Sequence, residues 1–139
     1  MVKYSWLIGG LALIASPVNA LQIKSIVVTP VLSSTVTASG QPIVLPQKDV
    51  QVLVSVYQIA PGAILPVHKH PYPRYGYVLA GTLKVTDTQT GESKIYRSGD
   101  FIIEAIGRWH QGANIGSTPA KLLVIDQVEK GQSNLILRK

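Results

Sequence analysis

Residues 62–81 read GAILPVHKHPYPRYGYVLAG and residues 99–114 read GDFIIEAIGRWHQGAN, and together they contain all three histidines of the chain. Short runs of Val, Ile, Leu and Tyr between prolines and glycines are typical of strands. Residues two apart in an extended segment point to the same face, so the imidazoles of His68 and His70 can reach one metal ion. A third ligand must arrive from another strand, and His110 is the only histidine left. The two stretches therefore predict a β-fold that gathers three histidines.

The rest of the chain continues as strands. Val, Ile, Thr and Tyr dominate runs that predict strands at residues 23–29, 50–60, 75–79, 82–88, 94–97, 101–104 and 120–128. Residues 89–92 and 97–100 are predicted turns, and residues 39–47 form a predicted long loop. No segment after residue 20 is long and periodic enough for a helix. Short strands at close spacing favour a sandwich or a barrel.

The composition restricts what the chain can do. Its 139 residues are 46% hydrophobic and 14% charged, which fits one compact domain and excludes disorder. The net charge is +6, but the basic residues are scattered, so we expect no nucleic-acid partner. The chain has no cysteine, which excludes disulfides, thiolate metal sites and a cysteine nucleophile. Any metal site must therefore combine histidine with oxygen ligands.

The first twenty residues have the pattern of a secretory signal peptide. Lys3 precedes the apolar run LIGGLALIA, and Val18 and Ala20 are the small residues before a cleavage site. The run is too short to cross a bilayer core of about 30 Å, and the alternative is a buried N-terminal helix of the domain. We expect residues 1–20 to be removed and residues 21–139 to form a single periplasmic or secreted domain without a stable membrane anchor.

The two histidine-containing stretches also resemble the two motifs of the cupin family. The spacing of these motifs is matched by Gly62, His68, His70 and Gly81, and then by Gly99, Gly107, His110 and Asn114. Arg74 stands where the family usually has glutamate, and Ala105 where it usually has proline. The resemblance covers roughly residues 50–128 and implies an all-β, cupin-type jelly-roll β-barrel with a ligand pocket inside.

The resemblance further implies that His68, His70 and His110 bind one divalent transition metal, since they occupy the family's ligand positions. The alternative is that they are ordinary core or surface histidines. Imidazole suits Fe, Zn, Ni, Mn and Cu, so the ligands do not select the metal, although the similarity to three-histidine cupin dioxygenases favours Fe(II). Asn114 is predicted to orient His110, with a turn or edge role as the alternative.

Arg74 departs from the family pattern, and its guanidinium cannot coordinate a cation, so the predicted site has three histidine ligands. A fixed positive charge about 5 Å from a divalent ion costs roughly 6 kcal/mol at an effective dielectric of about 20. We predict that Arg74 receives a substrate carboxylate and that Tyr75 also binds substrate, with a surface charge and aromatic packing as the alternatives. Glu104 is predicted to relay protons or to pair with Arg74 or Arg108, most simply in a surface ion pair.

Three functions remain open from the sequence. The first is an exported metal-dependent enzyme, an oxygenase or dioxygenase acting on a small anionic molecule. The second is a non-catalytic module that binds a small molecule, and the third is a structural dimer whose site has decayed. The apolar segment 21–36 lies outside the motifs and favours a homodimer that pairs through edge strands. The fold alone does not separate these functions.

Overall fold

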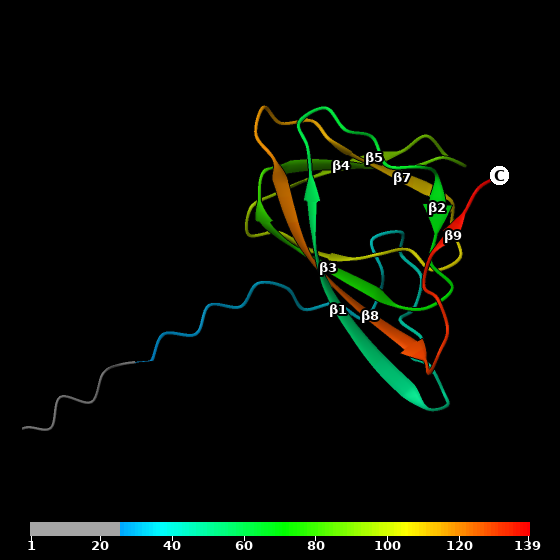
Figure 1. Cartoon of the computed structure of the whole chain (residues 1–139). Coiled ribbons are helices and arrows are strands. Elements are labelled where there is room, and N and C mark those ends of the chain that lie inside the picture. The colour runs from blue at the N-terminus through cyan, green and yellow to red at the C-terminus, as the bar shows by residue number, and fades with distance from the viewer. Residues whose placement is uncertain (1–25) are drawn as a thin grey trace, which may run out of the picture.

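The computed structural model describes residues 26–139, a part of the chain that contains nine strands and no helix (Figure 1). The strands are β1 (Val50–Ile59), β2 (His68–Lys69), β3 (Arg74–Ala80), β4 (Thr82–Asp87), β5 (Ser93–Arg97), β6 (Phe101–Ile103), β7 (His110–Asn114), β8 (Ala120–Glu129) and β9 (Ile136–Leu137). The predicted signal peptide lies outside the described residues. Over residues 26–139 there is accordingly no helix with the length and apolar character needed to span a membrane.

The strands form two antiparallel sheets. One has the order β1-β8-β3-β6 and the other β5-β4-β7-β2-β9. Strands β3 and β6 are neighbours in the first sheet although β4 and β5, which separate them in sequence, belong to the second. Figure 1 shows β1 and β8 running side by side in one wall and β4, β5 and β7 in the other. This arrangement confirms the predicted all-β jelly-roll barrel.

The core lies between the two sheets. Every second side chain of β8 is buried, and Leu122 and Val124 pack there with Val78 of β3 and Leu83 of β4. Gly81 joins β3 to β4 with a φ of +83°, and a Cβ at this position would lie 2.7 Å from the Cα of Ala120. Only glycine fits this backbone conformation and this close approach, so the β3–β4 hairpin depends on it.

Six predicted strands agree with β1, β3, β4, β5, β6 and β8 to within one residue at each end, and both predicted turns are present. The strand predicted at residues 23–29 is wrong over its described part, because residues 26–29 pair with no strand and Ile26 is 90% exposed. The prediction missed β2, β7 and β9 as strands. These strands are short or rich in polar residues, and their pairing depends on partners distant in sequence.

The face of the four-stranded sheet that points away from the core is also apolar. Val50, Val52, Val54 and Val56 alternate along β1 and are 53–62% exposed. Strand β1 is at the end of its sheet, so one of its edges has no neighbouring strand in the described part of the chain. An apolar face and an open edge therefore lie together on the side opposite the core.

Candidate metal centre

Strand pairing brings the three histidines together. His68 of β2 is directly opposite His110 of β7, and His70 forms a bridge with Ile106 just beyond β2. The centroids of the three imidazole rings lie 4.4–4.9 Å apart, and all three residues are buried. The structure thus places the three predicted ligands in one cluster.

Each imidazole is held in one orientation by a backbone carbonyl. The Nδ1 atoms of the three rings, in sequence order, lie 2.8, 2.7 and 2.9 Å from the carbonyl oxygens of Pro66, Asn134 and Arg108. A carbonyl oxygen only accepts hydrogen bonds, so each Nδ1 carries the proton and donates it. In the neutral form of each ring the Nε2 atom then has a free lone pair, and this is the form that binds metal.

Glu104, which directly follows β6, is the fourth member of the cluster. Its Oε2 lies 3.2 Å from Nε2 of His70 and 3.1 Å from Nε2 of His110. Burial by itself raises the pKa of the Glu104 carboxyl, but the two histidines outweigh burial and hold that pKa well below its usual range. Burial by itself lowers the pKa of His110, and the Glu104 carboxylate reverses this and raises it. A carboxylate is therefore kept ionised among the imidazoles.

This position of Glu104 corrects two predictions. A surface ion pair with an arginine is wrong, because Asp126 pairs with Arg74 and Asp87 pairs with Arg108. The prediction of only three protein ligands is also incomplete, since the carboxylate of Glu104 joins the histidines. Glu104 follows β6, whereas the position of the family's usual glutamate, occupied here by Arg74, is the first residue of β3. Glu104 was noticed in the sequence, but only the fold shows that it points into the barrel.

The four side chains fit a divalent metal ion. Their donor atoms all lie within 4.8 Å of one another, and ligands about 2.1 Å from one ion lie up to about 4 Å apart, so small side-chain shifts suffice. The Nε2 atoms of His70 and His110 are buried and make no hydrogen bond within residues 26–139. They are close to Glu104 without hydrogen-bond geometry, as expected of atoms aimed at a shared centre. A metal ion would satisfy these otherwise costly polar atoms.

Arg74 is buried, with 5% exposure, and points to Asp126 on β8. Its Nε and Nη2 donate to the two carboxylate oxygens of Asp126 at 2.7 and 2.8 Å. Burial by itself lowers the pKa of the guanidinium, but Asp126 outweighs burial and raises it. The alternative of a surface charge is therefore wrong, and the bidentate position predicted for a substrate carboxylate is filled by Asp126. This pairing also compensates the positive charge that would oppose a metal.

Tyr75 lies on the other side of its sheet from Arg74, because successive side chains of a strand alternate. It borders a groove on the outer face of the sheet, and its hydroxyl donates to Oε1 of Gln127 at 3.1 Å. The prediction that Tyr75 binds substrate in the barrel is therefore wrong.

Asn114 stabilises the turn between β7 and β8. Its amide nitrogen donates to the carbonyl oxygens of Ile59 and Thr118, both at 2.9 Å, and its amide oxygen accepts from the backbone N–H of Gly116. The side chain is thereby committed to backbone groups, and His110 is oriented by Arg108 instead. Of the two roles considered for Asn114, the turn role is confirmed and the orienting role is wrong.

Glu104 and His110 stand between an inner cavity and an outer pocket. The inner cavity has a volume of about 40 Å³, and Arg74, His68 and Tyr57 also line it. The outer pocket has a volume of about 260 Å³, and its charged or polar wall residues include Asp87, Glu92, Lys94, Tyr96 and Arg108. A small molecule in the outer pocket would therefore meet the metal cluster at Glu104 and His110.

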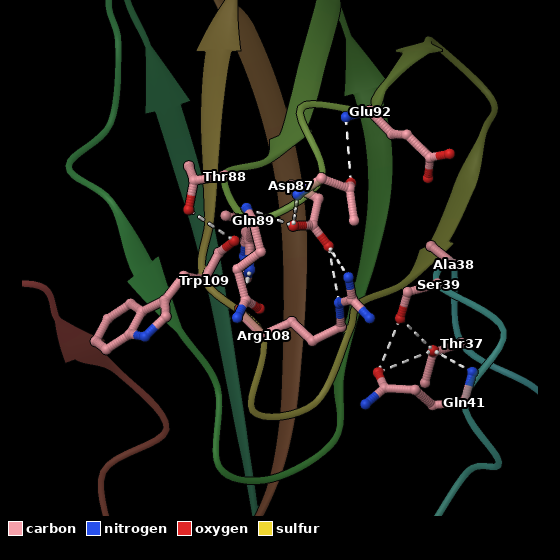
Figure 2. Close-up of polar contacts among 12 residues, drawn as sticks. Thr37, Ala38, Ser39, Gln41, Asp87, Thr88, Gln89, Glu92, Arg108 and Trp109 are labelled. Atoms are coloured by element: carbon pink, nitrogen blue, oxygen red, sulfur yellow. Dashed lines mark hydrogen bonds and ion pairs between the residues drawn. The ribbon is translucent and has the colours of Figure 1, made fainter.

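An N-terminal strap, residues 34–43, forms part of the wall of the outer pocket. Gln41 exchanges hydrogen bonds with both backbone groups of Ile106, at 2.8 and 3.1 Å, which ties the strap to the segment after Glu104. Figure 2 shows the bonded side chains of the strap near the ion pair of Arg108 with Asp87, whose shortest distance is 2.7 Å. The strap and the ion pair together shape the entrance to the site.

Sequence analysis missed two buried residues behind the cluster, Asp126 and Asn134. Asp126 points to the same buried side of β8 as Leu122 and Val124. An acidic residue at such a position in an apolar strand indicates that it has a buried partner of opposite charge or a hydrogen-bond donor. Asn134 lies in a short tail with no regular pattern, so the sequence contains no comparable signal for it.

Comparison with known families and structures now identifies the chain. The family model described as "Cupin domain" matches residues 55–126, which is more than half of the chain, and the chain belongs to the cupin family. No curated protein sequence matches the chain significantly.

Several solved structures share the fold. The polyketide cyclase RemF from Streptomyces resistomycificus is 17% identical, with a TM-score of 0.54 over 70% of each chain. A conserved protein with a double-stranded β-helix domain from Klebsiella pneumoniae subsp. pneumoniae MGH 78578 is 21% identical, with a TM-score of 0.54 over 83% of this chain and 99% of that one. The DMSP lyase DddQ from Ruegeria pomeroyi DSS-3 is 19% identical, with a TM-score of 0.53 over 62% of this chain and 42% of that one. Identities this low support a common fold and nothing more specific.

Proposed function

We propose that this cupin binds one divalent transition-metal ion through His68, His70, His110 and Glu104 and uses it to transform a small molecule. The observation that carries the proposal is the convergence of buried Nε2 atoms whose rings are each fixed through Nδ1 by a backbone carbonyl. Such outer hydrogen bonds orient metal-binding histidines and increase their basicity. A shared metal ion would give a partner to the buried Nε2 atoms of His70 and His110, which make no hydrogen bond within residues 26–139.

Three neutral imidazoles and one carboxylate suit iron(II), and also Mn, Ni, Cu or Zn, so our assignment of Fe(II) is part of the proposal. Bound iron(II) would supply oxygen activation and polarisation of a coordinated substrate. Glu104 compensates one of the two positive charges of such an ion, which leaves a net positive centre. That remaining charge, and not Arg74, is what we expect to attract an anionic substrate.

The protein residues around the cluster would select and shield the substrate. Val85 and Ile102 give the outer pocket an apolar wall, and Lys94 and Arg108 are its cationic residues, with Arg108 already paired with Asp87. Small-molecule sites generally have volumes of about 300–1,000 Å³, so a pocket of about 260 Å³ favours a small substrate. We therefore propose an oxygenase of a small carboxylate or thiol, exported to the periplasm or medium as the signal-peptide pattern indicates.

Metal analysis of the purified protein tests the binding half of the proposal. We expect close to one divalent ion per chain in the wild type and none in His110→Ala, with a folded barrel in both. Tyr75→Phe is the matched control, because Tyr75 lies on the outer face, and it should retain the metal. Full metal content in His110→Ala would refute the ligand assignment.

Oxygen uptake tests the catalytic half. The iron(II)-loaded protein is mixed with small carboxylates and thiols, and we expect uptake that depends on one of these compounds and disappears in His110→Ala. A compound that raises the melting temperature of the metal-loaded protein without oxygen uptake would instead support the non-catalytic binding module. Uptake that is equal in wild type and His110→Ala would refute catalysis at this site.

A further inference from the structure

The C-terminal tail, residues 130–139, turns back after β8 and runs alongside β2, as Figure 1 shows in red. Strand β9 pairs with β2, so that Leu137 lies opposite His68. The backbone N–H of Arg138 donates to the carbonyl of Val67 at 2.9 Å, and its guanidinium lies 6.0 Å from the ring centroid of Trp109. The tail is thus joined to β2, which carries His68, and to Trp109, which directly precedes His110 in the sequence.

Asn134 is the one buried residue of this tail, with 4% exposure. Its backbone carbonyl accepts the hydrogen bond from Nδ1 of His70 at 2.7 Å. Its side chain accepts from the backbone N–H of Tyr72 at 2.9 Å and donates to the Pro73 carbonyl at 3.3 Å and to Oδ1 of Asp126 at 2.6 Å. The side chain therefore fixes the position of the carbonyl that orients His70.

Asp126 connects this arrangement to Arg74. Its Oδ1 accepts from both Nε of Arg74 and Nδ2 of Asn134, while its Oδ2 accepts from Nη2 of Arg74. All three residues are buried, so each polar group depends on the others for its hydrogen bonds. A continuous set of hydrogen bonds runs from Arg74 through Asp126 and Asn134 to the ring of His70.

We propose that Arg74, Asp126 and Asn134 are positioning residues that hold His70, and with it the metal site, through the C-terminal tail. This inference rests on the proposed metal-binding function. It gives Arg74 a role in place of the glutamate usual in the family: the arginine anchors Asp126, which anchors Asn134. Because residues that hold a metal-binding histidine typically change metal affinity 10- to 100-fold when mutated, the tail is a functional part of the site.

The test is Co²⁺ binding, followed by calorimetry and visible absorption, in the wild type, Asn134→Ala and Leu135→Ala. We expect Asn134→Ala to bind Co²⁺ about 10- to 100-fold more weakly and to show an altered absorption spectrum, because His70 changes its orientation. Leu135→Ala is the matched control in the same tail, since its side chain is 44% exposed, and it should resemble the wild type. A general loss of stability would lower the melting temperature of the metal-free protein but leave the Co²⁺ spectrum unchanged.

The outcomes separate the two proposals. Wild-type Co²⁺ affinity and spectrum in Asn134→Ala would overturn the positioning role and leave metal binding intact, whereas a wild type that binds no Co²⁺ would overturn both. If Asn134→Ala does not fold, NMR of the Zn²⁺-loaded wild type decides. We expect a slowly exchanging Nδ1 proton on His70, and an Nδ1 proton that exchanges too fast to be detected would overturn the proposal.

Discussion

Breaking the buried ion pair between Arg74 and Asp126 should strongly destabilise the barrel. Their side chains are only 6% and 10% exposed, and two hydrogen bonds of 2.7 and 2.8 Å join them. Arg74→Met would leave the Asp126 carboxylate in the interior without its cation, a change that costs about 3–5 kcal/mol in comparable buried pairs. Asn134 still donates to Asp126, so we expect the lower end, about 3 kcal/mol.

The assay is urea unfolding of the metal-free protein, because bound metal would add its own stabilisation. With a urea dependence of about 1.5 kcal/mol per molar, the midpoint of Arg74→Met should fall by about 2 M. The double variant Arg74→Met/Asp126→Leu removes both charges and should recover most of the loss, since apolar replacements of a whole buried pair are often neutral. A double-mutant cycle then gives the coupling between the two residues.

Arg108→Met is the matched control. Arg108 also has a 2.7 Å ion pair, with Asp87, but these side chains are 32% and 18% exposed, and such partly exposed pairs contribute about 1 kcal/mol or less. A loss below about 1 kcal/mol in Arg74→Met, equal to that of the control, would refute our description of the Arg74 pair as buried and structurally important.

Four further predictions follow from the site, the surface and the leader. Glu104→Gln should weaken Co²⁺ binding more than 100-fold, beyond the usual effect of residues that only hold a ligand, and calorimetry measures it; unchanged affinity would remove Glu104 from the ligand set. Burial by itself raises the pKa of the Asp87 carboxyl, but hydrogen bonds from Gln89, Thr90 and Arg108 outweigh burial and lower this pKa. Asp87 therefore stabilises the fold at pH values above its unfolded pKa of about 3.8, and this stabilisation is lost as the pH falls. The urea midpoint of Asp87→Asn should therefore lie below wild type at pH 7 and approach it near pH 3, and a constant difference would contradict this sign. The mature chain should be a homodimer through the apolar face of β1, so light scattering should give twice the chain mass and Val54→Lys should halve it, whereas a monomeric wild type would exclude the interface. Intact-mass measurement of the exported protein should show Leu21 as its first residue, and a retained Met1 would contradict processing.

Local sequence patterns were sufficient to predict most of the barrel. Runs of strand-forming residues between turn signals were sufficient to predict β1, β3, β4, β5, β6 and β8, because each of these strands is rich in apolar or β-branched residues. The segment at residues 23–29 has the same composition, but no partner strand accepts its hydrogen bonds in the part that the structure describes. Composition therefore predicts the capacity to form a strand, while pairing decides whether the strand forms.

The metal cluster was only partly predictable for a related reason. The i, i+2 spacing of His68 and His70 has a direct geometric meaning in extended chain, so the pair could be found. Glu104 and Asn134 act through contacts between distant segments, and nothing in their immediate neighbours distinguishes them from surface residues. The departure at Arg74 was visible, but its consequence depended on Asp126, 52 residues later.

The sequence separation between His70 and Asn134 sets an order of events during synthesis. The residue that orients His70 follows it by 64 residues, and synthesis runs from the N-terminus at about 5–20 residues per second. All four side chains of the proposed metal site are therefore made, and the strands that carry them can pair, seconds before the carbonyl of Asn134 exists. The orientation of His70 in the proposed metal site is therefore completed only after residue 134 has been synthesised and has joined the folded barrel.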